Sequence, residues 1–162
     1  MPAKKVVKDE TAGNFLLFLK SSIAFGCGGP ESKEKFFQSV FESYIPLLQI
    51  FYELRSSNIQ PKITMGLSPS VLRCLDAMNR SFEFDRYMSG RIEGAEADYS
   101  RNAAGQHKIL QRLADFYVKN YKETQSFYFE NIRRDILNAF KLLQKEGLIE
   151  IAAIPDSEYT SS

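Results

Sequence analysis

The chain has 162 residues, of which 44% are hydrophobic and 13% aromatic, enough to build the core of one domain. Its 21 Lys and Arg residues nearly cancel its 20 Asp and Glu residues, which argues against nucleic acid and anionic membranes as partners. The Lys-rich N-terminus leads only into "NFLLFL", which is shorter than the apolar core of a signal peptide. We therefore expect a soluble, cytoplasmic protein without a membrane span.

Polar segments flank the expected domain. Residues 1–12 and 156–162 are polar and predicted to be flexible, which leaves a single α/β domain at 13–155. The continuous apolar run at 14–19 predicts a strand that is buried on both faces, as parallel sheets require. The sequence "GCGGP" at 26–30 then breaks the chain, and its proline suits the first turn of a helix.

The next elements are a long amphipathic helix and a short strand. Apolar residues from Phe36 to Phe51 recur at spacings of three and four, which predicts one apolar stripe on a helix. Pro46 lies inside this stripe, and we expect a kink there because proline removes a backbone donor. Residues 63–67 alternate as in a strand, and Ser68 followed by Pro69 is typical of a helix N-cap.

A long helical region is expected at about 80–146. Three glycines at positions 90, 94 and 105 are predicted to interrupt its first part. Two apolar helix faces follow, one from Ile109 to Tyr121 and one from Ile132 to Leu143. The aromatic residues from Phe116 to Phe129 could stack on bases or sugars, but their helical spacing favours packing in the core. Gly147 is expected to end the second of these helices.

A third strand is expected at 148–154, where the sequence reads "LIEIAAI". The order is therefore strand, helix, strand, long helical region and strand. Successive strands joined by helices favour parallel pairing with right-handed crossovers. The predicted fold class is α/β, with a short parallel sheet of about three strands, helical crossovers and a long helical region.

The candidate site lies where the predicted strands end, because ligands of parallel α/β sheets bind at the carboxyl ends of the strands. Five side chains are expected there as substrate-binding residues: Lys20, Ser22, Ser68, Asp156 and Glu158. The two acidic residues are of the type that glycoside hydrolysis needs. However, both follow one strand near the chain terminus, where nothing forces either into a desolvated pocket, so no catalytic residue is assigned.

Metal and cofactor sites are not expected. His107 is the single histidine of the chain, so no zinc-ligand set and no histidine-based triad can be assembled around it. It lies in a helical stretch and is predicted to face solvent.

Two stretches resemble the N-terminal part of glycoside hydrolase family 57. "ESYIPLLQIFYEL" (42–54) is similar to the family's E-T-Y-I-P-L-L helix, and "ITMGLSPSVLRCL" (63–75) to its L-T-L-S-L-S-P-x-L-L-x-x-L strand and helix. Weaker similarity extends to "GNFLLFL" (13–19) and "LLQKEGLIEI" (142–151). The resemblance implies the first part of a (β/α)7 barrel and an ancestry among amylases, glucanotransferases and branching enzymes that act on α-glucans.

The chain departs from the family pattern at the first strand. The family's H-x-H-x-P-Y motif is replaced by "KSSIAF", with Lys20 and Ser22 at the positions of the histidines. A further family histidine would fall at about Glu158. The family's catalytic glutamate and aspartate belong to later strands, for which this chain has no sequence. The resemblance therefore implies a chain that is inactive alone.

Three hypotheses follow. The chain is an inactive relative of the family, kept as a binding or scaffolding module for which α-glucan is the candidate ligand. Alternatively, it is one chain of a split α-glucan hydrolase or branching enzyme, in which a second chain covers the open sheet edge. The third hypothesis is a helical protein-interaction module, which predicts that the apolar face from Ile109 to Tyr121 lies exposed.

Overall fold

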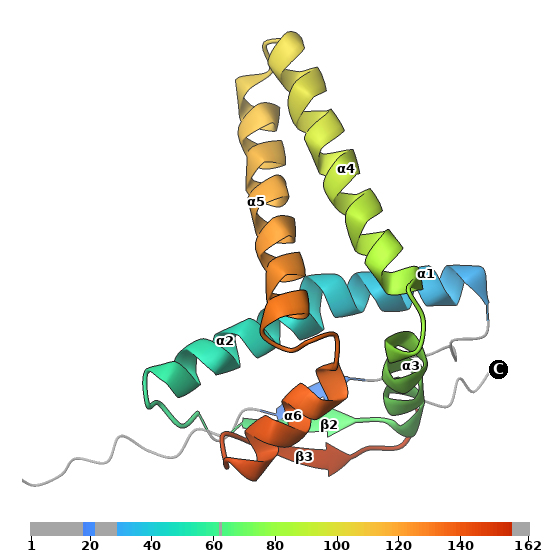
Figure 1. The fold of residues 1–162 in the computed structure, drawn as a ribbon, viewed down its shortest axis with the longest axis vertical. Coiled ribbons are helices and arrows are strands. Elements are labelled where there is room, and N and C mark those ends of the chain that lie inside the picture. The colour runs from blue at the N-terminus through green and yellow to red at the C-terminus, as the bar shows by residue number, and fades with distance from the viewer. Residues whose placement is uncertain (1–17, 22–28, 62, 157–162) are drawn as a thin grey trace, which may run out of the picture.

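The structure is a computed structural model that describes residues 18–21, 29–61 and 63–156 (Figure 1). Three strands and several helices form a base of two layers, from which a helical hairpin protrudes. In chain order the elements are β1 (Phe18–Ser21), α1 (Pro30–Ser39), the π-helical segment η1 (Val40–Tyr44), α2 (Ile45–Ser56), β2 (Ile63–Leu67), α3 (Pro69–Asn79), α4 (Glu83–Ala104), α5 (Lys108–Glu130), α6 (Ile136–Lys145) and β3 (Ile149–Ala153).

The sheet has the order β1-β2-β3, and both pairs are parallel. This arrangement confirms the predicted α/β class with a short parallel sheet. The first strand ends later than expected: its described part is Phe18–Ser21, whereas residues 14–17 of the predicted strand lie outside the described residues. Strand β3 coincides with the prediction to within one residue at each end.

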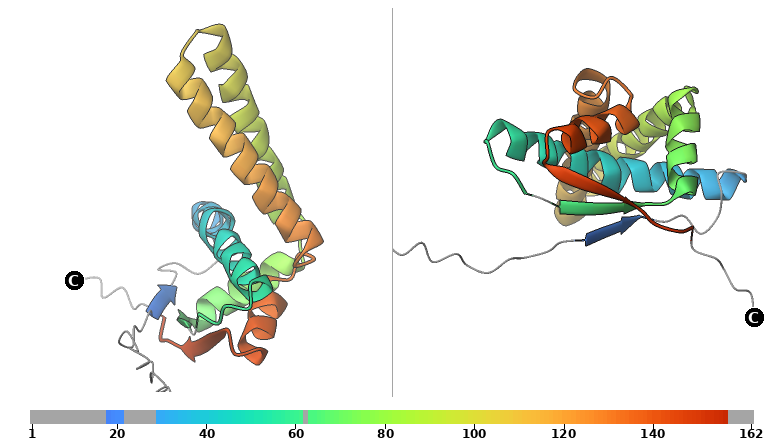
Figure 2. Two further views of the ribbon diagram at one scale, coloured as in Figure 1. Left: turned by 90° about the vertical axis from the view of Figure 1, so that its left-hand side faces the viewer. Right: turned by 90° about the horizontal axis from the view of Figure 1, so that it is seen from below.

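The helices of the base cover one face of the sheet (Figure 2). Toward them β2 directs Met65 and Leu67, which are almost completely buried, and β3 contributes Ile149. On the opposite face the Thr64 hydroxyl donates to a Glu150 carboxylate oxygen at 3.2 Å. Among the described residues no helix covers that second face. The two faces of this sheet therefore differ in character, because side chains alternate along a strand.

Helices α1 and α2 are joined by η1 into one rod that crosses the base (Figure 1). The helical geometry changes where the kink at Pro46 was expected. The Ile45 N–H donates to the Val40 carbonyl, five residues back, which is the π-helical pattern. Proline lacks an N–H and clashes with the preceding turn of an α-helix, and the widened turn directly before it accommodates both constraints. The apolar stripe continues past the proline, as expected.

Helix α4 runs without a break from Glu83 to Ala104, so the prediction that Gly90 and Gly94 interrupt it is wrong. Each of these glycines costs about 1 kcal/mol relative to alanine in a helix interior. Helix α5 packs along α4, with Ile92 and Ala95 of α4 buried, and this tertiary contact overrides the local preference. Gly105 is the C-cap of the helix, so the third glycine does end it.

The predicted core packing of the aromatic residues from Phe116 to Phe129 is confirmed for Tyr121, Phe127 and Tyr128 of α5 and is wrong for Phe116, Tyr117 and Phe129. Tyr121 is buried, but the other apolar side chains of the expected face are exposed: Ile109, Leu110, Leu113, Phe116 and Tyr117. Ile109 is 83% exposed and Phe116 is 60% exposed. The reason is topological, because the hairpin of α4 and α5 protrudes beyond the sheet and the rod, so only its lower half reaches the core (Figure 1).

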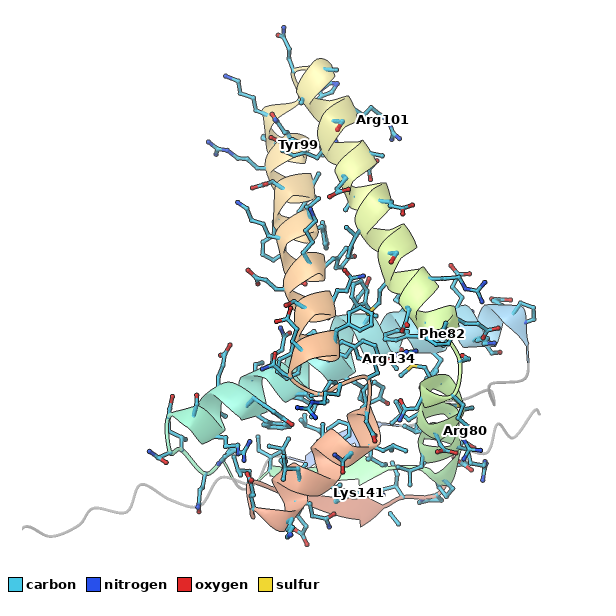
Figure 3. The ribbon with its side chains drawn as sticks, viewed as in Figure 1. Arg80, Phe82, Tyr99, Arg101, Arg134 and Lys141 are labelled. Atoms are coloured by element: carbon cyan, nitrogen blue, oxygen red, sulfur yellow. The ribbon has the colours of Figure 1, made fainter. Side chains whose placement is uncertain are left out.

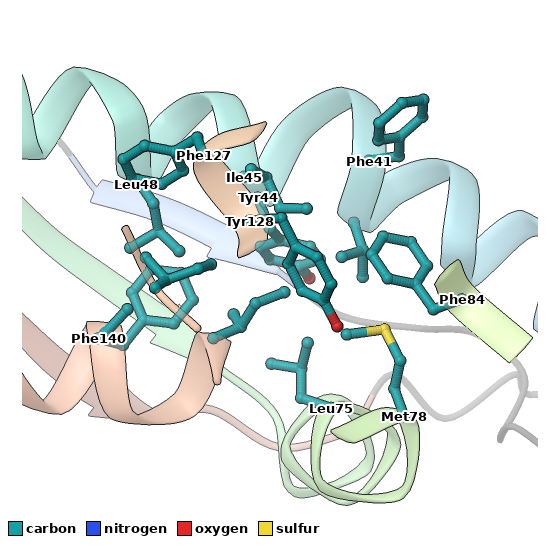
Figure 4. Packing of buried hydrophobic residues seen from close by; sticks show 14 of the residues in the cluster. Phe41, Tyr44, Ile45, Leu48, Leu75, Met78, Phe84, Phe127, Tyr128 and Phe140 are labelled. Atoms are coloured by element: carbon teal, nitrogen blue, oxygen red, sulfur yellow. The ribbon is translucent and has the colours of Figure 1, made fainter. Parts of the chain in front are cut away.

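The core lies between the rod, the sheet, α3, α6 and the lower end of the hairpin. Tyr128 of α5 inserts among Phe84, Met78 and Leu75 (Figure 4), with its ring centroid 5.2 Å from that of Phe84. Its burial raises the pKa of the Tyr128 hydroxyl to about 12. Helix α6 packs its apolar face inward and ends before Gly147, whose φ of 75° is the left-handed conformation predicted for this stop.

An ion pair joins the first turn of α4 to the loop that follows α5, at the base of the hairpin. Arg134, which follows α5, lies 2.9 Å from the Asp85 carboxylate of α4. Its guanidinium also donates to the Ser81 carbonyl at 3.3 Å and lies over the Phe82 ring at 4.4 Å (Figure 3). Burial raises the pKa of Asp85 more than the neighbouring Arg134 lowers it. Burial and the ion pair therefore act in opposite directions on this carboxyl group.

Replacing Arg134 by alanine leaves this carboxylate and the Ser81 carbonyl without their donor. We expect Arg134→Ala to lower the free energy of unfolding by about 2 kcal/mol, measured by urea denaturation with circular dichroism. Arg133→Ala is the matched control, because Arg133 is exposed and shares the left-handed backbone conformation, with φ of 50° against 68°. Equal losses in the two variants would contradict a stabilising role of the ion pair.

Candidate functional site

The three strands end level along one edge of the sheet. In the register of the sheet Ser21 pairs with Leu67, and Leu67 pairs with Ala153. Ligands of parallel α/β sheets bind at this edge, because the loops that leave the strands are free to vary there. The edge is therefore the place at which the predicted site residues can be compared with the structure.

Ser68 follows β2 and is the N-cap of α3, as predicted. Its side chain is completely buried and accepts a hydrogen bond from the Val71 N–H at 3.4 Å. Pro69 occupies the first helical position, where its missing N–H needs no partner. The Leu72 N–H donates to the Ser68 carbonyl at 3.1 Å, which begins the hydrogen bonding of the helix.

Asp156 follows β3 and caps the same helix. Its carboxylate accepts a hydrogen bond from the Ser70 N–H at 3.1 Å, and Arg73 lies 3.8 Å from the carboxylate. Hydrogen bonds from Ser68, and from the hydroxyl and backbone N–H of Ser70, lower the pKa of Asp156. A negative charge at the start of a helix is also favoured by the helix dipole. Together the two caps satisfy every backbone N–H of the first turn of α3.

The structure therefore brings together two of the five predicted site residues, Ser68 and Asp156, around the N-terminus of α3. Lys20 lies in β1 and pairs with Gly66 in the register of the sheet. Ser22 and Glu158 lie outside the described residues. A substrate-binding role for these five residues stays a prediction. The capping role of Ser68 was visible in the Ser-Pro sequence, whereas that of Asp156 depends on the pairing of β3 with β2.

A cleft that sequence reasoning missed lies between η1, α4 and α5. Its volume is about 460 Å³, and its walls include Gln38, Glu42, Gly90, Arg91, Gly94, Asp98, Tyr117 and Tyr121. The available signal was the pair of glycines four residues apart in a helical region, which lines one face of a helix. Because glycine is disfavoured in a helix interior, local propensity predicts an interruption of the helix at this pair instead.

Three polar side chains in the cleft hold one another. One terminal nitrogen of Arg91 lies 3.0 Å from a Glu42 carboxylate oxygen and also donates to the Tyr121 hydroxyl oxygen at 3.0 Å. The Tyr121 hydroxyl donates to the same Glu42 oxygen at 3.2 Å. Burial raises the pKa of Tyr121, so its hydroxyl stays protonated and able to donate. The network gives the cleft polar groups in fixed positions.

The described residues contain no group of three or more His, Cys, Asp and Glu side chains that could hold a metal ion. His107 is exposed just before α5, as predicted. Within the described part of the chain no helix is both long enough and apolar enough to cross a bilayer.

The lowered pKa of Asp156 generates a test of its capping role. The folded state holds this carboxyl ionised at a lower pH than the unfolded chain does, so its stabilising contribution is present above pH ~3.9 and is lost as the pH falls through the lower, folded-state pKa. We expect Asp156→Asn to be less stable than the wild type at neutral pH, with the difference narrowing on acidification. Thermal unfolding across the acid range measures it, and an offset that stays constant to low pH would contradict the charge effect.

No protein-family model matches the chain. A curated relative is the 1,4-alpha-glucan branching enzyme of Thermococcus kodakarensis, which is 26% identical over 122 residues, or 75% of this chain. The match covers 17% of that enzyme. The chain therefore spans about a sixth of the length of this curated relative.

Solved structures agree in fold. A GH57-type branching enzyme from Pyrococcus horikoshii superposes with a TM-score of 0.74 at 26% identity, over 86% of this chain and 26% of that one. The alpha-amylase AmyC of Thermotoga maritima gives a TM-score of 0.72 at 26% identity, over 85% of this chain and 26% of the amylase. Sequence and structure thus agree on the same group of enzymes, in each case over a fraction of their length. Over part of their length, the chain is therefore similar to enzymes of glycoside hydrolase family 57.

Proposed function

We propose that this chain is an α-glucan-related module of the glycoside hydrolase family 57 fold that has no hydrolase or branching activity of its own. The matched relatives are a 1,4-alpha-glucan branching enzyme and an alpha-amylase, which supports α-glucan as the class of ligand. Lys20 and Ser22 stand where the resemblance places the family's first-strand histidines. The proposal applies to the chain as it stands, which spans only part of each relative.

The position of Asp156 as a helix cap supports the proposal, because its carboxylate already accepts a hydrogen bond from the Ser70 N–H at 3.1 Å. A general acid in glycoside hydrolysis needs a raised pKa, so that it holds a proton at the working pH. The pKa of Asp156 is lowered instead, because Ser68 and Ser70 donate hydrogen bonds to the carboxylate. Such a group stabilises the start of α3 and is poorly suited to donate a proton to a leaving oxygen.

An activity assay tests this proposal directly. We expect the purified chain to release no reducing sugar from amylose or glycogen, and to leave the iodine-binding spectrum of amylose unchanged. The branching enzyme of Thermococcus kodakarensis is the positive control for the branching assay. Glucan release or branching by the chain alone would overturn the proposal, and its abolition by Asp156→Asn would assign the activity to this carboxylate.

The split-enzyme hypothesis has one observation in its favour. No helix of the described residues covers the sheet face that carries Thr64 and Glu150, and β3 pairs on one side with β2. A second chain that extends the sheet would remove the open edge. This hypothesis stays a prediction.

A second candidate function is supported by the exposed face of α5. We infer that the apolar side chains from Ile109 to Tyr117 bind an apolar helix of another chain, because a run of exposed large apolar residues on one helix face is typical of an interaction surface. The five side chains recur at helical spacing, which presents them to a partner as one stripe. A second copy of this chain carries the same stripe and is the partner to test first.

Light scattering over a wide range of concentrations measures this association. We expect a mass above 18.5 kDa that falls to the monomer value in the double variant Ile109→Ser, Leu113→Ser. Ile50→Ser is the matched control, because Ile50 of α2 is 52% exposed and Leu113 is 50% exposed. A wild-type chain that remains monomeric at every concentration would contradict pairing through this face.

A further inference from the structure

We propose that the cleft between η1, α4 and α5 binds a short segment of a neutral saccharide chain, with Tyr117 as its stacking platform. The inference rests on the proposed function for the class of sugar, an α-glucan, and adds the place at which that sugar binds. The cleft lies above the rod, on the side away from the sheet, and is therefore separate from the carboxyl edge of the strands.

An aromatic ladder forms one wall of the cleft. The ring of Phe41 in the core lies 4.8 Å from that of Tyr121, and Tyr121 lies 5.5 Å from Tyr117. Phe41 is buried, whereas Tyr117 is 43% exposed. The exposed ring of Tyr117 is therefore fixed by its contact with Tyr121, which packs on the buried Phe41. Pyranose rings present apolar C–H faces, and a fixed aromatic ring offers such a face a flat, weakly polar surface.

The polar groups of the cleft suit hydroxyl groups. Glu42 and Arg91 neutralise each other at 3.0 Å, and Gln38 donates to Glu42 at 3.0 Å. Asp98 lies 3.0 Å from Arg101. The acidic and basic side chains thus nearly balance, which favours an uncharged ligand over a phosphate or nucleic acid that would require an excess of positive charge. Carboxylate, guanidinium, amide and phenol groups together can accept from and donate to sugar hydroxyls.

Gly90 and Gly94 of α4 form a part of the cleft wall that has no side chains. A Cβ atom added at Gly90 or Gly94 would meet nothing within 4 Å, so packing within the chain does not require glycine at either position. Neither glycine has a left-handed backbone conformation. The two glycines therefore lower the stability of the helix although packing within the chain does not require them, and they line the same cleft as Tyr117. The lack of side chains at these two positions leaves room in the cleft for a pyranose ring.

Calorimetry with maltoheptaose on the whole chain tests the site. Gly94→Leu fills the open space and improves helix propensity, so its thermal stability should equal or exceed that of the wild type while binding is lost. Tyr117→Ala removes the platform and should weaken binding about tenfold. Tyr99→Ala is the matched control, because Tyr99 of α4 is 39% exposed, against 43% for Tyr117, and does not line the cleft.

The outcomes separate this inference from the proposed function. Loss of binding in Gly94→Leu and Tyr117→Ala, with wild-type affinity in Tyr99→Ala, supports the site. Wild-type affinity in both cleft variants overturns the site but leaves an α-glucan-binding module. Absence of binding by the wild-type chain also overturns the site. The proposal that the chain lacks activity fails on a different readout, the release or branching of glucan.

Discussion

The apolar stripe of the rod formed by α1, η1 and α2 is the surface on which both parts of the molecule depend. Its buried side chains face the sheet through Ile45 and Leu48, and they face the hairpin through Phe41, whose ring contacts Phe84 and Tyr121. One helix can serve two neighbours in this way because η1 widens the turn before Pro46 without ending the rod. Sheet and hairpin are held in one orientation by this shared core (Figure 4).

The position of the hairpin on the rod separates two surfaces of different chemistry. Below the rod, the strands end level at an edge where the described polar side chains cap α3. Above it, the hairpin creates a cleft whose polar groups are held by one another and whose aromatic wall is anchored in the core. In the family the first-strand histidines belong to the strand edge. Here the cleft proposed to bind a saccharide lies on the other side of the rod.

The chain matches a fraction of each solved enzyme, and part of its apolar and sheet surface is uncovered in the described residues. The chain superposes well on about a quarter of each related structure, and the remaining three quarters of those enzymes have no counterpart in it. One sheet face and the upper half of α5 are bare in the described residues. Surfaces of this kind are normally covered by further protein, which is why association is a direct question for this chain.

The sequence by itself determined the class of the fold and the ends of several elements. The Ser-Pro pair at 68–69 marked the cap of α3, Gly147 marked the end of α6, and alternation at 63–67 marked β2, because each of these signals acts through neighbouring backbone groups. The motifs at 42–54 and 63–75 also predicted the similarity to enzymes of glycoside hydrolase family 57 that the comparisons found.

Only the tertiary structure decided what is buried. Periodicity shows that α5 has an apolar face, but the same spacing describes Tyr121, which is buried, and Phe116, which is exposed. The difference depends on how far along the hairpin the rod extends. Gly90 and Gly94 were taken for an interruption because local propensity disfavours them, whereas packing against α5 holds the helix together. The role of Asp156 likewise required β3 to lie beside β2, 86 residues along the chain from its hydrogen-bond donor. Such contacts are absent from local sequence, because they are set by how distant segments pack.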